Sequence, residues 1–392
     1  MASEGMNTPI DIGERDLLEL LAMAGRALQP REAETLVSNT GLRLSKYQLE
    51  RISRERLSGF FLARAEILNL DSNTCELLSQ DHKTHLEEQL HLQAGTHSVS
   101  RILRDASIPH LFFKGWALSI LLGAEGELRG GGDVDVLIRP RDIVRAREHL
   151  KKSGFSALYP VQPRTSWGWK FITYRNRELP FRSSMLELDL HWRIGSEPSM
   201  MAPAEILLSR AMTVESGQHK IVTLSRVDTL AASAYHFFLD YGVSLRRLID
   251  FARLVAHTDP QALVALPKHA RQIVADVLAL CDELLGLRHE GHPELPTASL
   301  RNVEYLQGLF LRENARDVAL RQPTGKGRQS VFVRNYRHLR HYSDPVPLFA
   351  RLVARGMVWF PRATEHPGPV GLLHAFWWQL GRLLIGRTES HI

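Results

Sequence analysis

The sequence predicts an α+β fold, in which a small mixed sheet with helices lies between two helical regions. Residues 14–107 carry apolar residues at helical spacing and few prolines, and the helical pattern returns after about residue 200. Between these regions, short apolar runs alternate with glycine and proline, as is typical of strands and turns. These three observations predict helices, then a small α/β core, then helices again.

The N-terminal region is predicted to be helical throughout. Residues 17–23 are rich in leucine at helical spacing, and residues 51–70 carry another amphipathic pattern. A third pattern covers about residues 81–106. We expect three amphipathic helices before the core begins at residue 108.

The central segment predicts a mixed sheet. Its apolar or aromatic runs predict strands at residues 111–113, 134–138, 155–159, 169–174 and 185–192. Residues 116–122 and 141–153 are predicted helices. The second begins next to Pro140, which helices accept in their first turn, and ends at Gly154.

After the core, helical patterns occupy residues 204–212, 226–241, 244–257 and 270–285. We therefore divide the chain into four parts, which are an N-terminal helical region (1–107), an α/β core (108–200), a helical region that packs on the core (201–320) and a basic, aromatic-rich C-terminal region (321–392). The chain of 392 residues is long enough for several domains.

Composition limits the class of protein. The chain is 44% hydrophobic and 23% charged, values that are ordinary for a soluble globular protein. We find no apolar run near the roughly 18 residues that span a bilayer, and no targeting segment. The two cysteines, Cys75 and Cys281, are far apart, which argues against a disulfide framework or a structural zinc site. A cytoplasmic location is expected.

The positive charge is concentrated in residues 321–392. This segment holds eleven Lys or Arg residues against three acids, a net +8 in a chain whose total is +6. Such asymmetry suggests an anionic or macromolecular partner, with nucleic acid among the candidates, and a solvated basic face is the alternative. An apolar stripe around Trp377 and Trp378 is expected to pack on the protein rather than to rest on a membrane.

Three carboxylates stand out as candidate catalytic residues. Asp133 and Asp135 are two residues apart at the start of a predicted strand, so their side chains point to the same face. Two carboxylates this close repel unless a cation lies between them. Asp189, inside a second apolar run, is a candidate third metal ligand, with Glu187 on the same strand face as its rival. Carboxylates of this kind hold Mg²⁺ or Mn²⁺ in two-metal phosphoryl or nucleotidyl transfer.

The order of these residues resembles a known family. The run FFKGWALSILL, then ELRGGGDVDVLIRPRDIVRAREHLKKSGF, and the later LDLHWR at 188–193 are similar to the uncharacterised nucleotidyltransferases of the polymerase-β superfamily. The resemblance covers roughly residues 85–257 and, more loosely, the N-terminal helices. It implies a polymerase-β-like core, an NTP donor and divalent metal ions held by the three aspartates. The superfamily's usual Gly-Ser is replaced here by Lys114-Gly115.

The sequence also contains candidate substrate-binding residues near these aspartates. Lys114, Gly115 and Arg129 are expected to contact the triphosphate. The alternative for Lys114 is a surface lysine whose ammonium reaches solvent, and the alternative for Arg129 is an ion pair with Glu125 or Glu127. Gly132 allows a close approach of the chain. His191 is either a substrate contact or a structural hydrogen-bonding residue.

Two functions remain open at this point. The first is a metal-dependent nucleotidyltransferase that moves an NMP from an NTP to a hydroxyl-bearing acceptor, which is a small molecule, a biosynthetic precursor, a protein or RNA. The second is a non-catalytic protein of the same fold that binds nucleic acid or a partner through its basic C-terminal region. The presence of all three carboxylates favours the enzyme.

Overall fold

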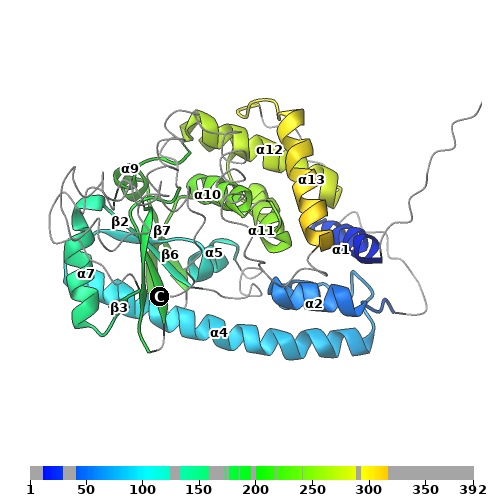
Figure 1. Ribbon diagram of the computed structural model, residues 1–392, viewed down its shortest axis with the longest axis horizontal. Coiled ribbons are helices and arrows are strands. Elements are labelled where there is room, and N and C mark those ends of the chain that lie inside the picture. Colours follow the sequence, from blue (N-terminus) through cyan, green and yellow to red (C-terminus); the bar gives the residue numbers. More distant parts are fainter. Residues whose placement is uncertain are drawn as a thin grey trace, which may run out of the picture.

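The computed structural model describes residues 12–29, 41–123, 133–158, 173, 176–184, 186–195, 200–216, 219–240, 242–287 and 293–316. Within them, the sheet lies at one side of the molecule and most helices lie at the other (Figure 1). The helices are α1 (Ile12–Leu28), α2 (Lys46–Arg54), α3 (Ser58–Leu62), α4 (Ser72–Asp105), α5 (Gly115–Leu121), α7 (Ile143–Lys152), α9 (Ala204–Ser209), α10 (Arg226–Leu239), α11 (Leu245–Ala256), α12 (Lys268–Leu285) and α13 (Leu300–Arg316), with short 3₁₀ turns at Pro140–Asp142 and Pro260–Ala265.

The sheet has seven strands in the part of the chain that the structure describes, in the order β3-β4-β5-β2-β1-β7-β6. The strands are β1 (His110–Phe112), β2 (Val134–Ile138), β3 (Ser156–Ala157), β4 (Glu178–Arg182), β5 (Glu187–His191), β6 (Met212–Ser216) and β7 (His219–Thr223). Strand β2 runs parallel to β5 and antiparallel to β1, so the sheet is mixed. An α+β fold with a mixed sheet is thereby confirmed.

The two faces of the sheet belong to two different cores. On β2, Val134 and Val136 pack into one core with the C-terminal part of α4 and with α7, while Leu137 belongs to the core of the helical half. Because side chains alternate along a strand, Asp135 points to the same face as Leu137, toward the helices that follow the sheet. The alternation of β2 therefore decides which side of the sheet carries the acidic residues.

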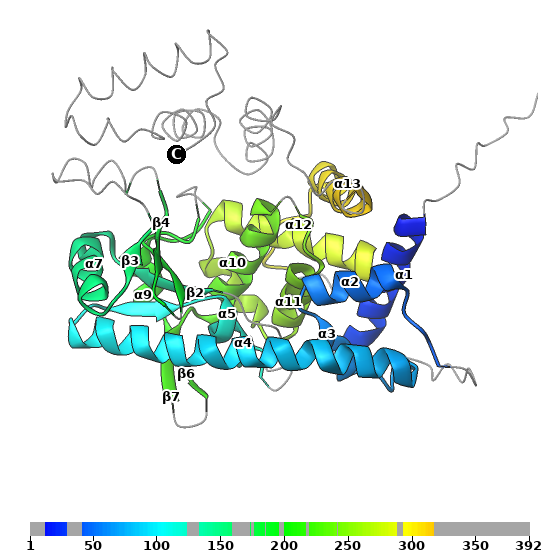
Figure 2. The same cartoon turned by 60° about the horizontal axis from the view of Figure 1, so that its bottom comes forward.

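Helix α4 connects both halves of the molecule. Figure 2 shows it running along the whole length, from beneath the sheet to α2 and α1. Leu78 near its start is part of the helical core, whereas Leu92, Val99 and Leu103 near its end pack under the sheet. Asp71 caps its first turn by accepting a hydrogen bond from the Thr74 amide at 2.7 Å.

The structure also corrects the predicted elements. Strands β4, β6 and β7 were not predicted, and the last two lie in the range assigned to helices after residue 200. Pro180 hid β4, since proline donates no ladder hydrogen bond. Helix α4 begins at Ser72 instead of residue 81. The strand predicted at 169–174 lies almost entirely outside the described residues, as does the C-terminal region 321–392.

No helix among the described residues combines the length and apolarity needed to cross a membrane.

Candidate active site

Two aspartates face each other across neighbouring strands. The parallel pairing of β2 with β5 places Asp135 directly beside Asp189, and their apolar neighbours Val134 and Leu188 beside each other. Those neighbours are buried on the opposite face, so the register is fixed by hydrophobic packing. Asp135 is buried and Asp189 is half-buried. The sheet therefore brings together two acids that are 54 positions apart in the chain.

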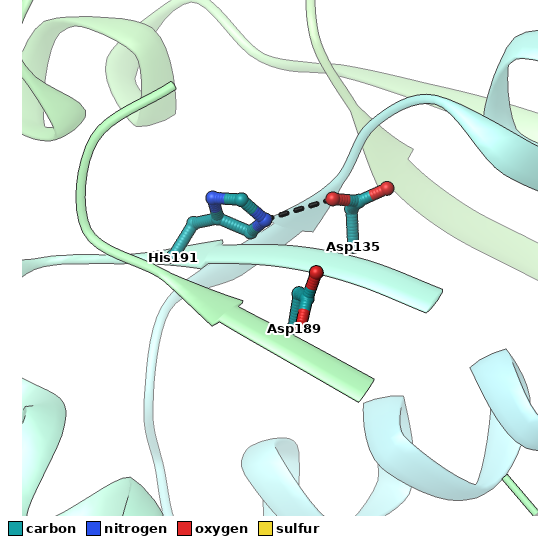
Figure 3. A group of neighbouring side chains, drawn as sticks. All are labelled: Asp135, Asp189 and His191. Atoms are coloured by element: carbon teal, nitrogen blue, oxygen red, sulfur yellow. Dashed lines mark hydrogen bonds and ion pairs between the residues drawn. The ribbon is translucent and has the colours of Figure 1, made fainter. Parts of the chain in front are cut away.

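Asp135 is held from two directions through a single oxygen. Lys114 Nζ donates to its Oδ1 at 2.9 Å, and His191 Nε2 lies 2.8 Å from the same oxygen (Figure 3). The other oxygen, Oδ2, is buried and has no hydrogen-bond partner in the described part of the chain. A buried carboxylate oxygen without a partner is costly, so this atom is suited to hold a cation.

The two carboxylates have opposite electrostatics. Burial acts to raise the pKa of Asp135, but the charge of Lys114 and the contact with His191 outweigh it, so that pKa lies well below its ordinary value. For Asp189, burial dominates and raises the pKa to about 6. The charge of His191 opposes this shift, while the neighbouring carboxylates add to it. Asp135 is thus the permanent anion, and Asp189 titrates close to neutral pH.

Lys114 and Gly115 form a turn of unusual backbone conformation. Both residues have positive φ, +62° at Lys114 and +41° at Gly115. A Cβ at Gly115 would lie 3.0 Å from the carbonyl oxygen of Asp133, so the glycine permits the two chain segments to approach closely. This turn aims the Lys114 ammonium at Asp135. A contact between Lys114 and phosphate stays a prediction.

A fourth acid, Glu178, was not found by sequence reasoning. It lies on β4 opposite His191, and its Oε2 is 3.2 Å from His191 Nδ1. That contact is an ion pair without the alignment of a hydrogen bond. Arg177 Nε donates to the same carboxylate at 2.7 Å. Burial acts to raise the pKa of Glu178, but His191 and Arg177 lower it below its ordinary value.

The other predicted residues divide into three groups. Asp133 is exposed immediately before β2, where its charge contributes to the raised pKa of Asp189. Glu187, the rival of Asp189, is exposed and pairs with Arg182 at 2.5 Å instead of joining the group. Arg129 and Gly132 lie outside the described residues.

The site fits a divalent cation. Asp135, Asp189 and His191 each offer one ligand atom, and these atoms lie within 4.8 Å of one another. In Figure 3 one oxygen of Asp189 points toward the contact between Asp135 and His191. Together with the unpaired Oδ2 of Asp135, this donor set is one that suits a divalent metal ion.

Comparison with known proteins gives one family. The model of a family described as uncharacterised nucleotidyltransferase matches residues 48–286, from within α2 to the residue after α12. This range contains every strand of the described sheet and all the acids discussed above. No curated protein matches the chain.

Proposed function

The chain belongs to the uncharacterised nucleotidyltransferase family, and on that basis we propose that it transfers an NMP from an NTP to a hydroxyl-bearing acceptor with the help of divalent metal ions. The observation that supports this most directly is the pairing of Asp135 with Asp189 in register, with the buried Oδ2 of Asp135 left unpaired. A protein that used this fold only for binding has no need for such an arrangement.

Asp133, Asp135 and Asp189 would hold the metal ions, which we propose to be Mg²⁺ or Mn²⁺. Asp133 is exposed immediately before β2, Asp135 is buried on that strand, and Asp189 is half-buried beside it on β5. When bound, such ions make the attacking oxygen more nucleophilic and neutralise charge on the transferred phosphate and on the leaving pyrophosphate.

Asp189 is suited to accept the proton of the acceptor hydroxyl. In the metal-free protein its pKa is raised to about 6, and a general base is most efficient when its pKa lies near the working pH. The hydroxyl oxygen would form a bond to the α-phosphorus of the NTP as the bond to the bridging oxygen of the β-phosphate breaks. The proton passes to Asp189, and pyrophosphate leaves with the electron pair.

Lys114 would steady the triphosphate. Its side chain is 23% exposed, and the ammonium already lies against the oxygen of Asp135 that faces the site. An ammonium in this position counters the phosphate charge without requiring bidentate geometry. Gly115 keeps the turn close to Asp133, and Arg129, Gly132 and His191 remain predicted substrate contacts.

The test is nucleotide transfer by the purified protein. Each α-³²P-labelled NTP is incubated with Mg²⁺ or Mn²⁺ and with cell extract, total RNA or the protein itself as acceptor. We expect metal-dependent label in one acceptor class. Asp135→Asn should reduce transfer by more than the roughly 10–100-fold that loss of a group supporting a metal site produces.

Glu187→Gln is the matched control, because Glu187 lies two residues before Asp189 but pairs with Arg182 and is not part of the ligand group. It should retain transfer within about twofold, as surface substitutions usually do. Absence of label with every NTP, together with metal-independent binding of RNA, would reject the enzyme in favour of a binding protein.

A further inference from the structure

We propose that His191 binds the metal ion directly through Nε2, and that Glu178 is the residue that positions its ring. The site would then be a mixed nitrogen and oxygen centre instead of an all-carboxylate one. This inference rests on the proposed function, since it concerns the same metal centre, and the experiment below separates the two.

The distances within the site support direct binding. His191 Nε2 lies 2.8 Å from Asp135 Oδ1, and Asp189 contributes a third ligand atom close to both. Ligands of a small divalent ion bind at about 2.1 Å, so adjacent donors around one octahedral ion are about 3 Å apart. Without an ion this spacing is a hydrogen bond, and with an ion it allows Nε2 and the Asp135 carboxylate to be neighbouring ligands.

Glu178 supplies the orientation that a ligating histidine needs. A histidine that binds a metal through one nitrogen almost always donates its other ring N–H to a carboxylate or a carbonyl. Within the described residues, the acceptor that His191 Nδ1 faces is Glu178, at 3.2 Å. In the metal-free protein Nε2 carries the hydrogen donated to the ionised Asp135, and Nδ1 lies 3.2 Å from Glu178 without an aligned hydrogen bond. When an ion displaces the Nε2 hydrogen, the negative carboxylate of Glu178 favours the tautomer with hydrogen on Nδ1.

The surroundings fix both side chains in place. The His191 side chain is fully buried, with its ring packed edge-on against Phe113 at 4.9 Å between centroids. Arg177 Nε donates at 2.7 Å to Oε2 of Glu178, the same oxygen that lies beside His191. The chain Arg177–Glu178–His191 therefore ends at the site with little freedom to turn, which is the arrangement expected of a supported ligand.

The proposal has a consequence for the choice of metal. An imidazole nitrogen binds divalent transition metals, Mn²⁺ included, more readily than it binds Mg²⁺, which prefers oxygen ligands and retained waters. We therefore expect the protein to bind Mn²⁺ more tightly than Mg²⁺. The dissociation constant for Mg²⁺ divided by that for Mn²⁺ should fall in His191→Asn, which replaces the nitrogen ligand by an amide.

Pulsed electron paramagnetic resonance of protein loaded with Mn²⁺ alone tests the ligand directly. We expect modulation of the electron spin echo from a directly bound ¹⁴N, changing to the ¹⁵N pattern when the protein is made with ¹⁵N-histidine. His191→Asn should abolish this coupling. His236→Asn is the matched control, since His236 is buried, packs on the same Phe113 ring and lies outside the group of ligand atoms.

Glu178 is tested by metal affinity. Glu178→Ala should raise the dissociation constant for Mn²⁺ by about 10–100-fold and weaken the nitrogen coupling, while Glu178→Gln, which keeps an acceptor oxygen beside Nδ1, should restore most of both. Glu187→Gln on β5 should leave the affinity unchanged within about twofold. Loss of affinity in Glu178→Gln equal to that in Glu178→Ala would contradict a role in holding the Nδ1 hydrogen.

The outcomes distinguish this inference from the proposed function. Bound Mn²⁺ without nitrogen coupling in the wild-type protein overturns the assignment of His191 and leaves the carboxylate centre standing. Failure of Mn²⁺ to bind at all overturns the proposed metal centre together with this inference. The wild-type protein and its ¹⁵N-histidine form suffice for the decision, even where His191→Asn does not fold.

Discussion

At the scale of single residues, the two central aspartates differ because of their contacts, although they share residue type, strand register and face. Lys114 and His191 both touch Asp135, and they offset the cost of burying its charge. Among the described residues, Asp189 has no comparable hydrogen-bond donor, so burial and neighbouring acids raise its pKa. One carboxylate is thereby kept ionised as an anchor, while the other is left able to exchange a proton.

The raised pKa of Asp189 predicts a pH-dependent stability in protein freed of metal by EDTA. The folded protein holds this proton up to about pH 6, whereas the unfolded chain releases it near 3.8. The protonated Asp189 carboxyl therefore contributes its full stabilising free energy below pH 3.8, and this stabilisation is lost as the pH rises through about 6. Relative to wild type, Asp189→Asn should become progressively more stable between pH 4.5 and 7.

Urea unfolding at intervals across this pH range measures the effect as the difference in free energy of unfolding between the two proteins. Adding Mn²⁺ should reverse the trend for the wild type alone, because the ionised carboxylate is the form that binds a cation. A difference between the proteins that stays constant from pH 4.5 to 7 would contradict the raised pKa.

At the scale of elements, the turn between β1 and α5 carries strain in order to place Lys114. This residue has φ +62° and ψ −160°, a region that residues other than glycine rarely occupy. Strain of about 1–3 kcal/mol per residue persists at sites where the surrounding structure imposes it. Here β1, paired with both β2 and β7, fixes the start of the turn.

The strain predicts a difference between two substitutions that both remove the ammonium. Lys114→Gly relieves the backbone, whereas Lys114→Ala retains the strain, so the glycine variant should be more stable by about 1 kcal/mol. Denaturant unfolding of the two variants side by side measures this difference, in which the lost ion pair with Asp135 cancels. Equal stabilities would mean that the turn relaxes once the lysine is gone.

A second element-scale feature joins α2 to α11. The carboxylate of Glu55, just after α2, accepts hydrogen bonds from Ser244 Oγ at 2.8 Å and from the amides of Leu245 and Arg246 at the start of α11. An acid at this position satisfies amides that have no partner inside the helix and complements the helix dipole. Glu55 thereby connects two helices that are nearly 200 positions apart in the chain.

Glu55→Ala should therefore destabilise the fold by about 1–3 kcal/mol, the usual cost of leaving buried donors unpaired. Chemical denaturation provides the measurement, and Glu50→Ala, in an exposed pair with Lys46, should change stability by less than about 0.5 kcal/mol. Affinity of the folded variant for Mn²⁺ should match the wild type, since Glu55 is not among the site residues. A change in affinity as large as that in Glu178→Ala would contradict this separation.

At the scale of the whole molecule, close packing of helices holds the helical half together. Helix α1 lies against the end of α12 at Gly25, where a Cβ would come within 1.8 Å of the carbonyl oxygen of Leu285. Backbone atoms cannot move aside as a flexible side chain does. Helix α1, which precedes the family-matched region, is thus in direct contact with the last residues of that region.

Gly25→Ala should be destabilising by about 1–3 kcal/mol, although alanine is the better helix former by about 1 kcal/mol. The clash of the new Cβ with the carbonyl oxygen of Leu285 outweighs the gain in helix propensity. Ala22→Gly, on the exposed face of the same helix, measures the local term alone and should cost about 1 kcal/mol. Thermal unfolding compares the two, and a stabilised Gly25→Ala protein would show that α1 packs differently from the structure described here.

Long periodic segments allowed much of this fold to be predicted from the sequence. Helices α5, α10, α11 and α12 and strands β1, β2 and β5 were predicted to within a few residues, because the apolar spacing of each is a local property. The short or polar strands β4, β6 and β7 were missed, since pairing with neighbours and not local pattern makes them strands. The division into four regions and the cytoplasmic location stay predictions.

The sequence by itself determined that Asp135 would lie in a strand between apolar residues, that Asp189 would lie in a second strand, and that the chain resembles nucleotidyltransferases. Spacing along a strand carries that information because side chains alternate. The shared face of Asp133 and Asp135 stays a prediction, since β2 begins one residue after Asp133. The tertiary structure alone decided that β2 pairs with β5 in a register that joins Asp135 to Asp189, that Glu187 pairs with Arg182, and that Glu178 lies beside His191. These depend on which strands are neighbours, and burial of both sheet faces, not local spacing, sets that choice.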